Sequence, residues 1–209
     1  MKKTICFVLI ISLVYSSILQ VYASDHLGSL TYWYSSSGTI YHWNATSRQI
    51  YCNNISGIGS SSFPFLTSIQ YGASLWSASV NLSLSTNTTN SSSPIYFYGG
   101  DQTSVCLLDS RIDYVYGRAG VVKYYGTYEG FYTYGTTSKN CYVFSLALGA
   151  VYYIAGKTEN QYKNTASHEI GHAIGWNGHG SSSNMIMYSS NSSVITLSTN
   201  DVLHIAQMY

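Results

Sequence analysis

Apolar positions recur at helical spacing in two stretches of the chain. Residues 66–77 carry apolar side chains three or four positions apart, which predicts an amphipathic helix. Residues 166–175 form the second predicted helix. Asn164 or Thr165 is expected to cap its N-terminus, and Gly175 is expected to end it.

Most other apolar runs have the pattern of strands. Residues 80–84 alternate between apolar and polar side chains, and the remaining runs are short and rich in aromatic or β-branched residues. Residues 101–140, rich in Gly and Tyr, are predicted to be irregular except for two short strands. The complete set of expected strands is 30–34, 39–43, 80–84, 95–98, 120–125, 129–134, 141–148 and 150–155.

The first 23 residues have the pattern of a secretory signal peptide. Lys2 and Lys3 precede an apolar run, and Ala23 ends a segment suited to signal peptidase. The run is shorter than the roughly 20 residues that a membrane span needs. We expect cleavage after Ala23 to release residues 24–209 as one secreted domain that is not held in a membrane.

Charged residues are scarce, and this excludes two classes of partner. Only 8% of the residues are charged and the net charge is +1, against roughly 25% charged residues in ordinary domains. Binding to nucleic acid or to a membrane surface would require a basic face. A hydrophobic content of 45% also excludes disorder driven by charge.

Three cysteines remain after the predicted signal peptide, so at most one disulfide can form within the chain. Cys106–Cys141 is the expected pair, because both residues lie in neighbouring β-rich segments. Cys52 would then be unpaired. We favour a buried apolar role for Cys52 over a thiolate that caps an active-site metal.

The chemistry is concentrated in the motif H-E-x-x-H at residues 168–172. On a helix, residues four apart lie on one face, so the imidazoles of His168 and His172 can bind the same zinc ion. Glu169 stands beside the first ligand, where it can take a proton from the water that zinc activates.

A catalytic zinc site needs a third protein ligand. No Glu follows Glu169, and Asp201 is better explained as a helix-capping residue. His179 follows the sharp turn that Gly175 permits, so His179 is the expected third ligand.

The segment from His168 to His179 resembles the metzincin signature H-E-x-x-H-x-x-G-x-x-H, with one residue inserted before the last His. Met187-Tyr188, eight residues after His179, is similar to the Met-turn of matrixin-like secreted metallopeptidases, although Ser189 stands where Pro is usual. Residues 66–77, 95–97 and 197–209 resemble the first helix, a central strand and the closing helix of that family, with less specific sequence.

The resemblance implies an α+β fold of the α/β-type metzincin architecture. Its parts would be a twisted, mostly parallel sheet with an edge strand over the cleft, two long helices that include the zinc-ligand helix, and a C-terminal helix. Residues 141–148 or 150–155 are the candidates for the strand that pairs with substrate.

The resemblance also implies roles for the site residues. One catalytic zinc would be held by His168, His172 and His179, with Glu169 as general base. Met187 would be structural, and Tyr188 is a candidate contact for the oxyanion or the substrate. The sequence supports neither a second zinc nor calcium, since Asp101, Asp109 and Asp113 are scattered. His26, His42 and His204 are interpreted as surface or packing residues.

The expected function is that of a secreted, monomeric zinc endopeptidase acting on proteins or peptides. Two alternatives stay open. One is a metallohydrolase of a non-peptide amide, which would use the same zinc chemistry. The other is a catalytically silent, zinc-containing protein that binds surfaces or carbohydrate, but Glu169 weighs against it because a structural zinc needs no adjacent base.

Overall fold

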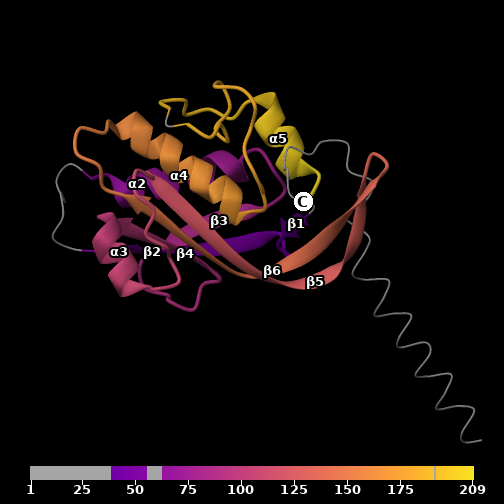
Figure 1. Ribbon diagram of the computed structural model, residues 1–209, viewed down its shortest axis with the longest axis horizontal. Coiled ribbons are helices and arrows are strands. Elements are labelled where there is room, and N and C mark those ends of the chain that lie inside the picture. The colour runs from indigo at the N-terminus through magenta and orange to yellow at the C-terminus, as the bar shows by residue number, and fades with distance from the viewer. Residues whose placement is uncertain (1–38, 56–62, 191) are drawn as a thin grey trace, which may run out of the picture.

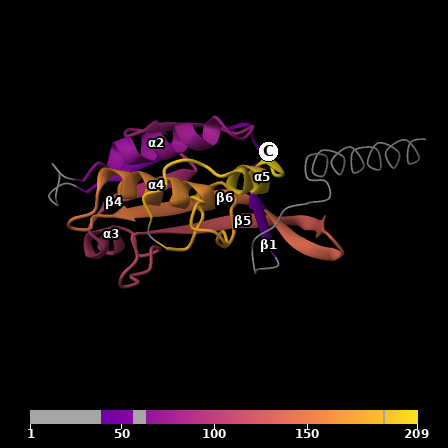
Figure 2. The ribbon, with the colours of Figure 1, turned by 90° about the horizontal axis from the view of Figure 1, so that it is seen from above.

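The computed structural model describes residues 39–55, 63–190 and 192–209. The predicted signal peptide, His26 and the strand expected at residues 30–34 lie outside this part of the chain. A six-stranded sheet forms one layer, and helices α2 and α4 lie side by side over one of its faces (Figures 1 and 2). In the described residues, no helix is both long enough and apolar enough to cross a membrane.

The sheet is parallel except for one strand. Its order is β1-β6-β4-β2-β3, and β5 pairs with β6 in the antiparallel sense. On its other side, β5 pairs with no strand in the described part of the chain, so β5 is an edge. The strands are β1 (Thr39–His42), β2 (Ser47–Asn54), β3 (Ser83–Asn87), β4 (Ile95–Gly100), β5 (Gly120–Tyr134) and β6 (Thr137–Tyr152).

The two faces of the sheet bury different cores. Ile95 and Phe97 of β4 point into the main core beneath α2 (Phe65–Ser77) and α4 (Glu159–Ala173). The alternate residue Tyr98 points to the opposite face, where it packs in a smaller core under α3 (Gln102–Leu108). This alternation follows from the period of two residues in a strand. The mixed α/β architecture agrees with the expected α+β fold.

Two buried tryptophans hold α4 against the core. The indole of Trp76 in α2 donates to the carbonyl of Ser167 at 2.8 Å, and the indole of Trp43 donates to that of Ala173 at 2.9 Å. A buried indole N–H needs an acceptor, so these bonds satisfy both side chains. They also fix the end of α4 that carries the H-E-x-x-H motif.

The helix expected at residues 166–175 begins earlier than predicted. Thr158 caps α4: its hydroxyl accepts the amide N–H of Gln161, and the Gln161 side chain accepts the amide N–H of Thr158. The expected caps Asn164 and Thr165 therefore lie inside the helix. The first two turns are mostly polar, so apolar spacing could not reveal them.

Several strand boundaries also differ from the prediction. The expected strands at 120–125 and 129–134 are one strand, β5, interrupted by register shifts after Tyr125 and Tyr128. The strands at 141–148 and 150–155 are likewise one strand, β6, which continues through Gly149. Neither β2 nor α3 was expected, and the strand predicted at 80–84 begins at Ser83. The helix at 66–77 and the strands at 39–43 and 95–98 are confirmed within a few residues.

The expected Cys106–Cys141 disulfide is wrong. All three described cysteines are free thiols. Cys106, a residue of α3, packs against the smaller core, whereas Cys141 is fully buried in the main core. Cys52 is buried in the main core, as expected for a small apolar residue.

Candidate metal centre and cleft

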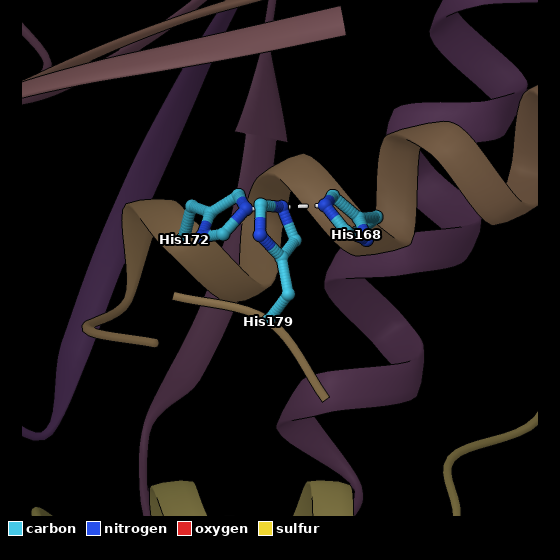
Figure 3. A group of neighbouring side chains, drawn as sticks. All are labelled: His168, His172 and His179. Carbon is cyan, nitrogen blue, oxygen red and sulfur yellow. Dashed lines mark hydrogen bonds between the residues drawn. The ribbon is translucent and has the colours of Figure 1, made fainter. Parts of the chain in front are cut away.

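Three histidines converge beside the last turns of α4. His168 and His172 lie one turn apart on the helix, and His179 reaches them from the loop that follows (Figure 3). Their ligand nitrogens all lie within 4.8 Å of one another. The structure thus brings together the three residues that the sequence proposed as zinc ligands, despite the inserted residue.

Hydrogen bonds orient the two helical imidazoles. Nδ1 of His168 donates to the carbonyl of Ile186 at 2.8 Å, and Nδ1 of His172 donates to the carbonyl of Trp176 at 2.6 Å. Burial lowers the pKa of His168 to about 4 and keeps the pKa of His172 well below its ordinary value. Both rings are therefore neutral near pH 7, with Nδ1 carrying the hydrogen and Nε2 left as an acceptor.

The two acceptors face each other in a way that fits a metal ion. Nε2 of His168 and Nε2 of His172 are 3.1 Å apart (Figure 3), with no hydrogen between them to share. Two nitrogen ligands of a tetrahedral zinc ion, each about 2.0–2.1 Å from the metal, are about 3.3 Å apart. The donor set and its spacing therefore fit zinc.

The loop that carries His179 is braced on two strands. Gly175 has a φ of 120°, and a Cβ there would overlap the carbonyl of Tyr41. The Asn177 amide donates to the carbonyl of Thr39 at 3.0 Å, and the Tyr124 hydroxyl donates to Oδ1 of Asn177 at 2.9 Å. The loop thus accommodates its additional residue by contacts with β1 and β5.

The Met-turn lies directly beneath the ligand helix. Met187 is fully buried, and a Cβ at Gly171 of α4 would overlap its sulfur. The amide N–H groups of Ile186 and Met187 donate to the two carboxylate oxygens of Asp201 at 3.0 and 3.2 Å.

Asp201 also belongs to a capping box at the start of α5 (Thr199–Ala206), formed with Ser198. The capping role expected for Asp201 is confirmed. The same carboxylate connects the closing helix to the Ile186 carbonyl that orients His168.

Glu169 is buried next to β5. Burial raises the pKa of its carboxyl to about 8, while the positive charges of Arg118 and Lys157 oppose the increase. A Cβ at Gly120 would lie 2.7 Å from Oε1 of Glu169. Only glycine at this position of β5 leaves room for the carboxylate where it stands.

A cleft of about 530 Å³ opens over these groups. Its walls are residues 117–122 and Tyr124, the side of α4 that carries the two histidines, and the segments at Gly178–His179 and Tyr188–Ser190. The expected substrate strands at 141–148 and 150–155 both belong to β6, which is paired on both sides. They cannot be an edge, and β5 takes that place.

Sequence reasoning missed several residues of the cleft. Asn164 and Thr165 line it, and they precede His168 by four and three positions, so helical spacing could have placed them on the same face. The amide of Asn164 donates to the carbonyl of Val194 at 2.7 Å. Arg118 and Gly120 carried no signal in the sequence, because they reach the site only through the pairing of β5.

The remaining candidate residues have separate roles. Asp101 caps α3, Asp109 pairs with Arg111, and Asp113 pairs with Lys123. His204 is fully buried with its ring 3.9 Å from that of Trp176, which agrees with a packing role. Met185 is a buried core residue.

A comparison with protein families identifies the family to which the chain belongs. The family model described as matrixin matches residues 65–209, more than half of the chain. The chain belongs to the matrixin family. It is therefore a zinc metallopeptidase, and the match spans the ligand helix, the Met-turn and the closing helix of this matrixin. A search of curated proteins found no match.

Proposed function

We propose that this matrixin is a secreted zinc endopeptidase in which His168, His172 and His179 hold the zinc and Glu169 is the general base. The observation that supports it most is the pair of imidazole Nε2 acceptors 3.1 Å apart, beside a buried carboxylate at the base of the cleft. A structural zinc site would need neither the carboxylate nor the opening.

The zinc ion would supply a Lewis acid that lowers the pKa of a water molecule and polarises the scissile carbonyl. Glu169 then takes a proton from the attacking water and later gives it to the leaving amine. A carboxylate in a buried, weakly solvated place holds that proton more readily than an exposed one does. Tyr188, on the cleft wall, is the candidate donor to the developing oxyanion.

The edge strand β5 supports cleavage within a chain. Val121, Val122 and Tyr124 of β5 line the cleft, and their strand carries an unpaired edge in the described part of the protein. An extended peptide can add to such an edge as a further strand. Substrate on both sides of the scissile bond would then be held by backbone hydrogen bonds, which suits an endopeptidase.

We also propose that the protein is exported from the cell and acts as a monomer. The basic, then apolar, then small-residue pattern of residues 1–23 supports export. After removal of the signal peptide, the domain formed by residues 24–209 would act outside the cell on proteins or peptides.

Cleavage of denatured casein tests the proposed reaction. The purified zinc-loaded protein should cleave casein inside the chain, and Glu169→Ala should lose about 10²- to 10⁴-fold in kcat/KM. The variant should keep its zinc content and its circular dichroism spectrum. Leu203→Ala, on the exposed side of α5, serves as the control and should cleave normally.

Two results would contradict the proposal. Equal cleavage by Glu169→Ala would remove Glu169 from the reaction. No cleavage of casein or of a peptide library by the folded, zinc-loaded protein would remove the endopeptidase activity itself.

A further inference from the structure

A second group of metal-binding side chains lies away from the cleft. His42 of β1, Glu129 of β5 and Cys141 of β6 come from three adjacent strands, and their ligand atoms all lie within 4.8 Å of one another. Nε2 of His42 donates to Oε2 of Glu129 at 2.7 Å, and the Cys141 thiol donates to the same oxygen at 3.7 Å. None of the three takes part in the proposed reaction.

Glu129 stands at an irregularity in β5. Tyr128 pairs with Tyr142 and Gly130 pairs with Cys141, so Glu129 is an additional residue between two ladder positions. Such a bulge changes the direction in which a side chain points. Tyr128 lies against Tyr142, whose ring stacks on Tyr41, whereas Glu129 lies on the other side of the ribbon beside Cys141.

The cluster is almost entirely buried. The side chains of His42 and Cys141 are fully buried, and that of Glu129 is 10% exposed. Charged groups are costly to bury, and buried sets of this kind are commonly paired or bound to a metal. Glu129 is the member of the cluster that retains contact with solvent.

We propose that His42, Glu129 and Cys141 bind a second zinc ion, separate from that of the cleft. Imidazole nitrogen, thiolate sulfur and carboxylate oxygen are the three ligand types that zinc takes from proteins, and a water molecule would complete four-coordination. The distance between His42 and Glu129 must increase from 2.7 Å to about 3.3 Å for both to bind one tetrahedral ion. The Glu129 carboxylate would have to move by this amount when the ion binds.

The ion would join β1 to the β5–β6 hairpin. In Figures 1 and 2, β1 meets β6 where the twisted β5–β6 ribbon leaves the body of the molecule. Within the described residues, β1 spans Thr39–His42 and pairs only with β6. A metal ligand on β1 would therefore link the β5–β6 hairpin to the strand that braces the His179 loop through Thr39.

Cobalt binding gives a spectroscopic signal that can distinguish the second site from the cleft site. Co²⁺ accepts the same ligand types as zinc, and a cobalt–thiolate bond adds a charge-transfer band in the near ultraviolet. The cleft site has only histidine ligands, so the band reports the second site. We expect the metal-free protein to bind two equivalents of Co²⁺ and to develop this band. A folded His168→Ala variant, with the cleft site impaired, should retain the band.

Variants of single cysteines identify the thiol. Cys141→Ser should abolish the band, whereas Cys52→Ser, a buried cysteine in the same core, should keep it. Should Cys141→Ser fail to fold by circular dichroism, His42→Gln supplies a second measurement. Its affinity for the second equivalent should fall by more than the roughly 10- to 100-fold typical of losing an outer partner.

The proposal is overturned by either of two results. One is binding of a single Co²⁺ per chain with no thiolate band. The other is a band that survives in folded Cys141→Ser and disappears in Cys52→Ser or Cys106→Ser. Neither result bears on casein cleavage, so this proposal and the proposed peptidase function can fail independently.

Discussion

At the scale of single residues, the cleft depends on two glycines whose missing side chains leave room for functional groups. Glu169 occupies space that any Cβ at Gly120 would fill, and Met187 lies where a Cβ at Gly171 would be. The two histidines of the motif owe their tautomers to backbone carbonyls of Ile186 and Trp176. The H-E-x-x-H motif thus supplies two ligands, but backbone carbonyls outside the motif, four and eighteen residues further along the chain, orient them.

Gly120→Ala should separate zinc binding from catalysis. The new Cβ would lie 2.7 Å from both Cγ and Oε1 of Glu169, so the carboxylate must move. Because displacement by about 1 Å can cost about 10²-fold in rate, we expect kcat/KM for casein to fall by about that factor. Zinc content, measured by mass spectrometry, should stay the same.

Gly100→Ala is the matched control for this change. Gly100 lies in β4 of the same sheet, and the nearest atom to a new Cβ is on Ile55 at 3.3 Å. This variant should keep its activity. Loss of zinc from Gly120→Ala, or full activity in that variant, would contradict the role assigned to Gly120.

At the scale of elements, α4 and α5 meet through the Met-turn. The indoles of Trp43 and Trp76 anchor α4 on its buried side, while Asp201 at the start of α5 holds the backbone of Ile186 and Met187. The carbonyl of Ile186 in turn orients His168. The closing helix therefore supports the metal centre without contributing a ligand to it.

Asp201→Ala should weaken both the fold and the metal site. Two buried amide N–H groups and the N-cap would lose their acceptor, and we expect a loss of about 2–4 kcal/mol in the free energy of unfolding. Zinc affinity should fall by about 10- to 100-fold as His168 loses its orientation. Urea unfolding and competition with a chelator measure the two effects.

Two further variants make this prediction specific. Asp201→Asn retains one acceptor oxygen and should fall between wild type and Asp201→Ala. Leu203→Ala changes an exposed residue of the same helix and should shift stability by about 0.5 kcal/mol or less. Unchanged zinc affinity in a folded Asp201→Ala variant would show that α5 has no influence on the metal centre.

At the scale of the whole molecule, the small number of charged residues means that few ionisable groups can make the free energy of unfolding depend on pH. Asp109 is one of them. Asp109 directly follows α3 and is buried; its carboxylate accepts two hydrogen bonds from the Arg111 guanidinium at 2.8 and 2.7 Å and one from the Tyr98 hydroxyl at 3.0 Å. These hydrogen bonds lower the pKa of Asp109 to about 2, although burial opposes the decrease.

The depressed pKa of Asp109 predicts a loss of stability in acid. The carboxylate stabilises the folded state above its unfolded pKa of about 3.9, and this contribution is lost as the pH falls through about 2. We expect Asp109→Asn to cost about 1–2 kcal/mol at pH 6 and almost nothing near pH 2. Urea unfolding of wild type and variant at both pH values gives the difference, in which effects common to both proteins, such as zinc release, cancel.

Asp113 offers the comparison for this measurement. It pairs with Lys123 at 2.7 Å, but its side chain is 64% exposed, so Asp113→Asn should change stability little at either pH. A cost for Asp109→Asn that is equal at pH 6 and pH 2 would contradict the electrostatic explanation.

The sequence by itself determined the parts of this protein that depend on near neighbours along the chain. His168, Glu169 and His172 could be placed together because a helix repeats every 3.6 residues. The same reasoning identified α2 and the capping role of Asp201. It failed at the start of α4, where Thr158 and Gln161 form a cap in a polar stretch.

Only the tertiary structure decided what depends on strand pairing. The bulge at Glu129, the approach of Gly120 to Glu169 and the place of β5 at the edge all follow from the register between β5 and β6. Register joins residues that are far apart in sequence, and it sets which side of the sheet each one faces. The same register places Cys141 beside His42 and Glu129, whereas Cys106 lies in α3 and packs in the smaller core.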